Sequence, residues 1–215
     1  MPLFHAPEVG IVYSNAIYFV EGTKFRYPLY GKCSPPKGHI FKELIRSNHL
    51  TLGTVLIKRK CLDGVEWFPE DMNHAEEYDL FLRISYLWKA DYSREHLVRY
   101  RIHNQAGSVA GYNSMPEEMK RILSRLYVFL PDIEKKYGAE VLELRKNVDI
   151  VEANVLWKKN KRKEARGKFL NMFKTSKELK PLIFFFLTFF CGFERYNVTK
   201  HRLKHLKGKF ITLCF

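Results

Sequence analysis

The hydrophobic positions of the first sixty residues alternate between strand-like and helix-like spacing. Residues 9–20 (VGIVYSNAIYFV) are rich in β-branched and aromatic side chains, which predicts one strand or two. Residues 22–36 are punctuated by Gly, Pro and Ser and indicate a loop. Residues 39–46 have apolar side chains at 40, 41, 44 and 45, the spacing of a short amphipathic helix. Residues 50–58 indicate a buried strand that Gly53 interrupts, either as a packing bulge or where a ligand approaches the backbone.

The most informative helix pattern comes next. Asn73 and Glu76 have the spacing of a capping box, so we expect Asn73 to be the N-cap of a helix. Positions 77, 80, 81, 84, 87 and 88 fall on one face of that helix, and five of these six residues are apolar. The exception is Glu77, and a carboxylate at the head of a buried stripe must be paired, protonated or put to use. Asp79 and Arg83 form an ordinary i,i+4 pair on another face.

Residues 96–103 (HLVRYRIH) alternate in polarity and predict a half-buried strand. One face is apolar, and the other presents Arg99, Arg101 and His103. From about residue 116 the pattern becomes helical, and no strand pattern returns before the final residues. We therefore expect an α/β body over 1–110, a helical extension over 111–180 and a hydrophobic, basic tail over 181–215.

Charge separates the two ends of the chain. The net charge is +14, and residues 151–215 hold 16 Lys and Arg against 4 Asp and Glu, so most of the excess lies there. A hydrophobic fraction of 46% excludes a disordered chain. The cysteines lie far apart with no CxxC pair, which argues against a zinc site and a dense disulfide framework. The first residues lack a signal-peptide pattern, so we expect reduced thiols and a cytoplasmic location.

Residues 181–193 (PLIFFFLTFFCGF) are uncharged and flanked by basic residues. As a helix they would span about 20 Å, less than the roughly 30 Å of a bilayer core. An apolar segment with cationic flanks suits the interface of an anionic leaflet, which predicts peripheral attachment at the inner face of the cell membrane. The alternative is a buried core helix with solvated flanks. His201 and His205 are four residues apart, and we interpret them as a solvated face rather than as metal ligands.

The segment HAEEYDLFLRIS, followed by LVRYRIH, resembles the second half of family 2 glycosyltransferases, which have the GT-A fold. The matching positions are the acidic pair Glu76-Glu77, Tyr78-Asp79-Leu80, Arg83, Tyr100-Arg101-Ile102-His103 and Ser108. Upstream, residues 9–16 resemble the strand that follows the metal-binding loop of that fold, and residues 48–59 resemble the strand before its acidic helix. The resemblance covers roughly residues 1–110. It implies an α/β fold, a partial GT-A fold that lacks its N-terminal nucleotide-binding half, followed by a helical C-terminal tail.

Two departures from the family pattern matter. The family base is usually Asp, whereas Glu77 is one methylene longer, and a misplacement of about 1 Å can cost about 10²-fold in rate. No Asp-x-Asp occurs in this chain, although the resemblance implies a divalent metal, Mg or Mn, bound at such a loop. We therefore expect either a fragment of a longer reading frame or a broken or split gene. A separate chain would then supply the donor half, and this chain would be inactive alone.

The resemblance implies transfer of a sugar, with inversion, from a nucleotide-sugar donor to a glycan or lipid-linked acceptor, for surface polysaccharide or glycolipid synthesis. Glu77 would be the base, and its neighbour Glu76 would cap the helix or assist. Arg101 and His103 would meet the leaving diphosphate, and His103 could also bind a divalent metal, unless the two form a solvated or salt-bridged edge. Thr54 would line the acceptor pocket.

Two other classes of function stay open from the sequence. One is a non-catalytic remnant that binds a glycan, a lipid or a partner subunit. The other is nucleic-acid binding through the cationic tail, because clustered Lys and Arg contact phosphates. The phenylalanine-rich segment within that tail suits lipid better, so we do not expect a nucleic-acid partner.

Overall fold

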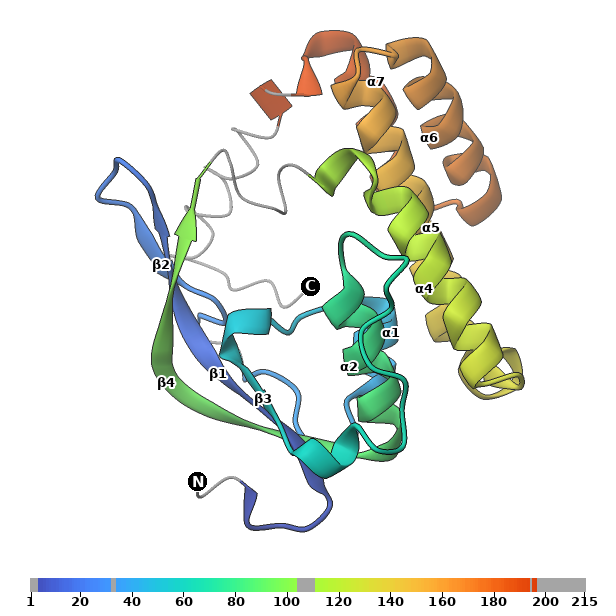
Figure 1. The fold of residues 1–215 in the computed structure, drawn as a ribbon. Coiled ribbons are helices and arrows are strands. Elements are labelled where there is room, and N and C mark those ends of the chain that lie inside the picture. The colour runs from blue at the N-terminus through green and yellow to red at the C-terminus, as the bar shows by residue number, and fades with distance from the viewer. Residues whose placement is uncertain (1–3, 32–33, 104–110, 194, 197–215) are drawn as a thin grey trace.

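A computed structural model describes residues 4–31, 34–103, 111–193 and 195–196. They form a small mixed sheet followed by a helical C-terminal region, which confirms the α/β class and the helical extension (Figure 1). None of the described helices combines the length and apolar character that crossing a membrane requires.

The long strand β1 (Val9–Val20) organises the sheet. It pairs antiparallel with β2 (Arg26–Pro28) and β3 (Val55–Ile57), and parallel with β4 (Lys89–Ile102) along nearly its whole length. The register between β1 and β4 shifts near the middle of β1, where the partner of Ser14 is Ser93 but the partner of Asn15 is His96. The resulting bulge re-aims the side chains of β4 at this point.

The helices lie in layers on one side of this sheet. In Figure 1, α1 and α2 lie between the sheet and the pair α4–α5, and α6 and α7 pack together beside the far part of α5. The helix bounds are α1 Phe41–Arg46, α2 Glu76–Leu87, α4 Met115–Phe129, α5 Ile133–Lys158, α6 Arg162–Ser176 and α7 Leu179–Phe190.

Two hydrophobic cores hold these layers together. The first joins Ile11 and Tyr13 of β1 to α1, α2, α4 and the first half of α5, and it includes the fully buried Phe81 and Ile122. The second gathers Trp157 and other residues of α5, α6 and α7. The first core thus continues across residue 110, where the sequence places the end of the α/β body. The division into 1–110, 111–180 and 181–215 stays a prediction.

Several local predictions are confirmed and others are wrong. The strand over 9–20 and the half-buried strand over 96–103, the end of β4, are confirmed. The predicted loop over 22–36 contains the short strand β2. The predicted buried strand over 50–58 is a 3-10 turn followed by the three-residue β3, with Leu52 and Leu56 about half exposed because only β1 pairs with β3 among the described strands. Gly53 lies in that turn and forms no bulge.

The predicted capping box at the start of α2 is wrong. The helix begins at Glu76, and Ala75 precedes it in a left-handed conformation with φ of 62°. No side chain caps the first turn. Asn73 therefore lies outside the helix start, and the Glu76 side chain does not cap the helix.

Candidate functional site

Helix α2 is held rigidly by buried polar contacts. Burial is continuous from Tyr78 to Ser85, so every face of this stretch is packed rather than a single stripe. The Asp79 carboxylate accepts hydrogen bonds from Arg83 at 2.7 and 3.0 Å and from Arg125 of α4 at 3.2 Å. Arg83 also donates to the backbone carbonyls of Glu66 and Trp67. The sequence predicted an ordinary i,i+4 pair, and the structure shows a buried network with a structural role.

The Tyr78 side chain adds a second anchor from the same turn. Its hydroxyl donates to the backbone carbonyl of Leu44 at 2.6 Å, which ties α2 to α1. Because α2 is fixed to α1, α4 and the 66–67 segment, the position of its first turn is fixed as well. A rigid support of this kind is what a catalytic side chain needs, since misplacement by about 1 Å is costly.

Glu77 lies in that first turn and is half-buried. Burial raises the pKa of the Glu77 carboxyl, and the neighbouring Glu76 carboxylate raises this pKa further. A hydrogen bond from the Glu77 backbone N–H and the proximity of His74 act in the opposite direction and lower it. No ion pair joins Glu77 to a cation within the described part of the chain. The result is a carboxyl group with a raised pKa whose proton-accepting oxygens are not committed to a salt bridge. This is the state that a general base requires.

The chain returns to the start of α2 after β4. Gly111 lies against the His74 ring so closely that a Cβ there would be 2.5 Å from the imidazole atoms. Only glycine fits this approach without moving His74. Gly111, at the start of the described range that follows His103, therefore lies beside His74, three positions before Glu77.

The other predicted site residues lie elsewhere or serve local contacts. Arg101 pairs with Glu21 at 3.1 Å, and both side chains are more than half exposed, as expected for a salt-bridged edge. His103 follows the end of β4 and is partly buried. Thr54 is buried, but its hydroxyl donates to the Thr51 carbonyl at 2.7 Å within the same turn. No hydrogen bond or ion pair joins these side chains to Glu77 within the described ranges.

Three further residues singled out in the sequence, Ser108, His201 and His205, lie outside the described residues. Across the part of the chain that is described, no three His, Cys, Asp or Glu side chains are grouped to hold a metal ion. The divalent metal implied by the resemblance therefore finds no matching ligand set there. That metal stays a prediction.

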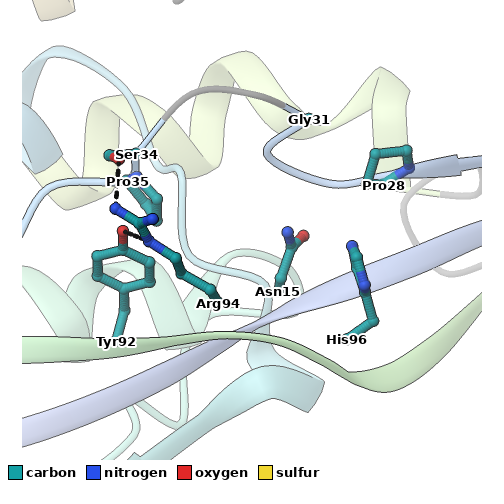
Figure 2. A pocket seen from close by; sticks show the side chains of 8 residues that line it. All are labelled: Asn15, Pro28, Gly31, Ser34, Pro35, Tyr92, Arg94 and His96. Atoms are coloured by element: carbon teal, nitrogen blue, oxygen red, sulfur yellow. Dashed lines mark hydrogen bonds between the residues drawn. The ribbon is translucent and has the colours of Figure 1, made fainter.

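A pocket that the sequence did not predict opens over the bulge between β1 and β4 (Figure 2). Its volume is about 240 Å³, and its lining consists of Asn15, Pro28, Gly31, Ser34, Pro35, Tyr92, Arg94 and His96. The Arg94 side chain donates to the Tyr92 hydroxyl at 3.2 Å and reaches the Ser34 hydroxyl at 3.4 Å. Hydrogen bonding to Ser34 and then to Arg94 lowers the pKa of Tyr92.

The lining of this pocket is rich in hydrogen-bond donors. The Asn15 side-chain oxygen accepts from the backbone N–H groups of Ala16 and Tyr30 at 2.9 and 3.2 Å, which leaves its NH₂ group as a donor. Figure 2 shows the side chains of Asn15 and His96 projecting together from the two strands. A guanidinium, an imidazole and an amide in one pocket suit phosphate, carboxylate or sugar hydroxyl groups. The alternation of polar and apolar residues along β4 does not predict this pocket, because the register shift between β1 and β4 brings its lining residues together.

Comparisons with protein-family profiles, curated proteins and solved structures each find no match to this chain. The resemblance to family 2 glycosyltransferases and their GT-A fold therefore rests on the sequence motifs alone.

Proposed function

We propose that this chain is the acceptor-side part of an inverting glycosyltransferase with a GT-A-like fold, and that Glu77 is its general base. The observation that carries the proposal is the Glu77 carboxyl. It is half-buried, has a raised pKa, forms no ion pair with the described cations and stands on a helix that a buried polar network fixes in place. The motif resemblance supplies the reaction class.

In the proposed reaction, the Glu77 carboxylate removes the proton from an acceptor hydroxyl as that oxygen bonds to the anomeric carbon of the donor sugar. The bond from the anomeric carbon to the nucleotide diphosphate breaks, and the diphosphate leaves with the electron pair. Attack and departure occur on opposite faces, so the configuration inverts. A positioned base contributes about 10²- to 10⁴-fold, and a raised pKa makes the carboxylate a better base near neutral pH.

Arg101 and His103 are the proposed contacts for the leaving diphosphate. The Arg101–Glu21 pair is exposed, and exposed pairs contribute little stability. The guanidinium can therefore exchange the Glu21 carboxylate for phosphate oxygens, which it binds in a bidentate manner. The glycan or lipid-linked acceptor would approach the first turn of α2.

Sugar transfer tests this proposal. Membranes from the cells in which the chain occurs naturally, which would also hold the separate chain that supplies the donor half, are incubated with a panel of radiolabelled nucleotide sugars. Membranes from cells that lack this chain give the background. We expect Glu77→Gln to lower transfer by about 10²-fold or more. Glu117→Gln is the matched control, since it makes the same substitution at an exposed carboxylate on α4 outside the site, and it should retain most of the transfer. Equal transfer by wild type and Glu77→Gln contradicts the proposed role of Glu77.

The same assays distinguish an enzyme from a protein that binds glycans without catalysis. Transfer absent with every donor, together with equal binding of immobilised glycans by the wild-type chain and Glu77→Gln, would identify a non-catalytic acceptor module. That result would overturn the enzymatic part of the proposal.

A further inference from the structure

Helix α7 presents an apolar face to solvent. Leu179, Ile183, Phe186 and Phe190 are 69%, 56%, 52% and 81% exposed. Their spacing of four, three and four residues places them on one side of the helix, and we call this set the α7 stripe. The opposite side packs against α6 and α5, where Phe184 and Phe185 contact the second core.

This arrangement reverses the usual polarity of a surface helix. A helix packed on a globular protein turns its polar residues outward, yet Lys180 is the only charged residue of α7 and the one hydroxyl, on Thr188, is buried. Contiguous exposed apolar surface marks a binding site for a partner or a membrane. The other side of α7 packs on the second core, and no described residue covers the stripe.

Cations surround the stripe. The Arg166 guanidinium lies 4.2 Å from the centroid of the Phe189 ring, at the edge of the stripe. Arg162 approaches Gly192 beyond the end of α7, and Lys177 and Lys180 lie at its start. Between residues 162 and 190 the chain has seven Lys and Arg against two Asp and Glu.

Both acidic residues of this stretch are already paired. Glu164 pairs with Lys161, and Glu178 pairs with Lys146. The net charge around the stripe is therefore positive, which complements an anionic surface. Apolar side chains bordered by basic ones match the layers of a membrane interface, where acyl chains lie beneath negatively charged headgroups.

We propose that the α7 stripe docks on an anionic lipid surface, with α7 lying in the plane of the interface and Arg166, Lys177 and Lys180 at the level of the headgroups. Twelve residues of helix extend about 18 Å, which suits a position along the interface. This docking does not depend on the activity proposed above, because it uses residues far along the chain from Glu77.

Vesicle co-sedimentation tests the proposal. The purified chain is spun with vesicles of phosphatidylcholine alone or of phosphatidylcholine mixed with phosphatidylserine. We expect stronger binding to the mixed vesicles. The double substitution Ile183→Ser and Phe186→Ser should weaken it by about tenfold or more, because two large side chains lose their apolar environment. Val128→Ser is the matched control, since Val128 is 83% exposed on α4 and lies outside the stripe.

Charge-reversal variants measure the electrostatic contribution to vesicle binding. Lys177→Glu and Lys180→Glu should each lower binding to the mixed vesicles by at least about fivefold, and change binding to phosphatidylcholine vesicles little. Circular dichroism establishes that each variant is folded. Because the replaced side chains are exposed, we expect the wild-type spectrum.

Three results would overturn the proposal. The first is equal vesicle binding by the wild type and the double serine variant. The second is a dimer in sedimentation equilibrium that the double variant dissociates, with no vesicle binding by the wild type, since the stripe would then bind a second copy. The third is binding to an oligonucleotide but not to the mixed vesicles.

Discussion

Two helices of twelve residues each, α2 and α7, differ in a way that their composition does not explain. Helix α2 carries four charged residues, yet eight of its residues are buried. Helix α7 carries one charged residue, and only Pro181 and Thr188 are buried. The first is enclosed by the sheet, α1 and α4, whereas the described residues contact the second on one side only. The composition of a helix determines how much free energy its burial would contribute. Its place in the fold determines whether other parts of the protein bury it.

The contrast is sharpest for a matched pair of phenylalanines. Phe81 of α2 is fully buried, and Phe186 of α7 is 52% exposed. We expect Phe81→Ala to lower the free energy of unfolding by about 3–5 kcal/mol, and Phe186→Ala to lower it by less than about 1 kcal/mol. Urea denaturation followed by circular dichroism measures both. Similar losses at the two positions would show that α7 is as enclosed as α2.

The buried ion pair of α2 gives the next effect. Arg83→Ala leaves the Asp79 carboxylate buried, with Arg125 as its remaining ion-pair partner among the described residues, and we expect a loss of about 3 kcal/mol in the free energy of unfolding. Lys120→Ala breaks an exposed pair with Glu117 and should cost less than about 1 kcal/mol. A loss at Arg83 no larger than the loss at Lys120 would show that the network does not hold α2 in place.

The close approach at the start of α2 predicts a smaller effect. Gly111→Ala places a methyl group 2.5 Å from the His74 ring, so the ring must move. We expect this overpacking to cost about 1–3 kcal/mol in urea denaturation. Gly167→Ala is the control, because a Cβ at that position meets no atom within 4 Å. If Gly111→Ala is as stable as wild type, the segment at residue 111 does not pack on His74.

The smallest effect concerns pH. Burial raises the folded-state pKa of Glu77 above its ordinary value of 4.5. The stability contributed by its protonated form is therefore complete below 4.5 and is lost as the pH rises through the folded-state pKa. We expect the wild type to lose stability relative to Glu77→Gln over that interval, as urea midpoints for the two proteins will show. A difference that stays constant with pH would contradict the raised pKa.

The sequence predicted local structure better than the contacts between distant segments. Periodicity located β1, the end of β4 and the C-terminal helices, because the spacing of apolar residues reports which faces are buried. The sequence prediction was wrong at the start of α2. Asn73 and Glu76 match a capping box, but the helix begins at Glu76, directly after Ala75 in a left-handed conformation. The prediction also overestimated the burial of residues 50–58, since nothing local marks β3 as an edge strand.

The candidate site was predicted unevenly for the same reason. Glu77 was identifiable because a charge interrupts an apolar stripe within one helix. The pocket at Asn15, Arg94 and His96 was not, because the register shift that joins two strands eighty residues apart leaves no mark on either strand alone. The burial of Asp79 and Arg83 likewise depends on Arg125, which lies on a distant helix.

The titration of Glu77 tests the central claim most directly, because it needs no substrate. Carbon-13 NMR of the labelled chain follows the side-chain carboxyl carbons with pH, and Glu77→Gln identifies the resonance. We predict that Glu77 ionises above the ordinary glutamate value of 4.5, as a half-buried carboxyl without a cation partner among the described residues does. Ionisation at or below that value would mean that a cation holds the carboxylate, and Glu77 would then be a structural residue rather than a base.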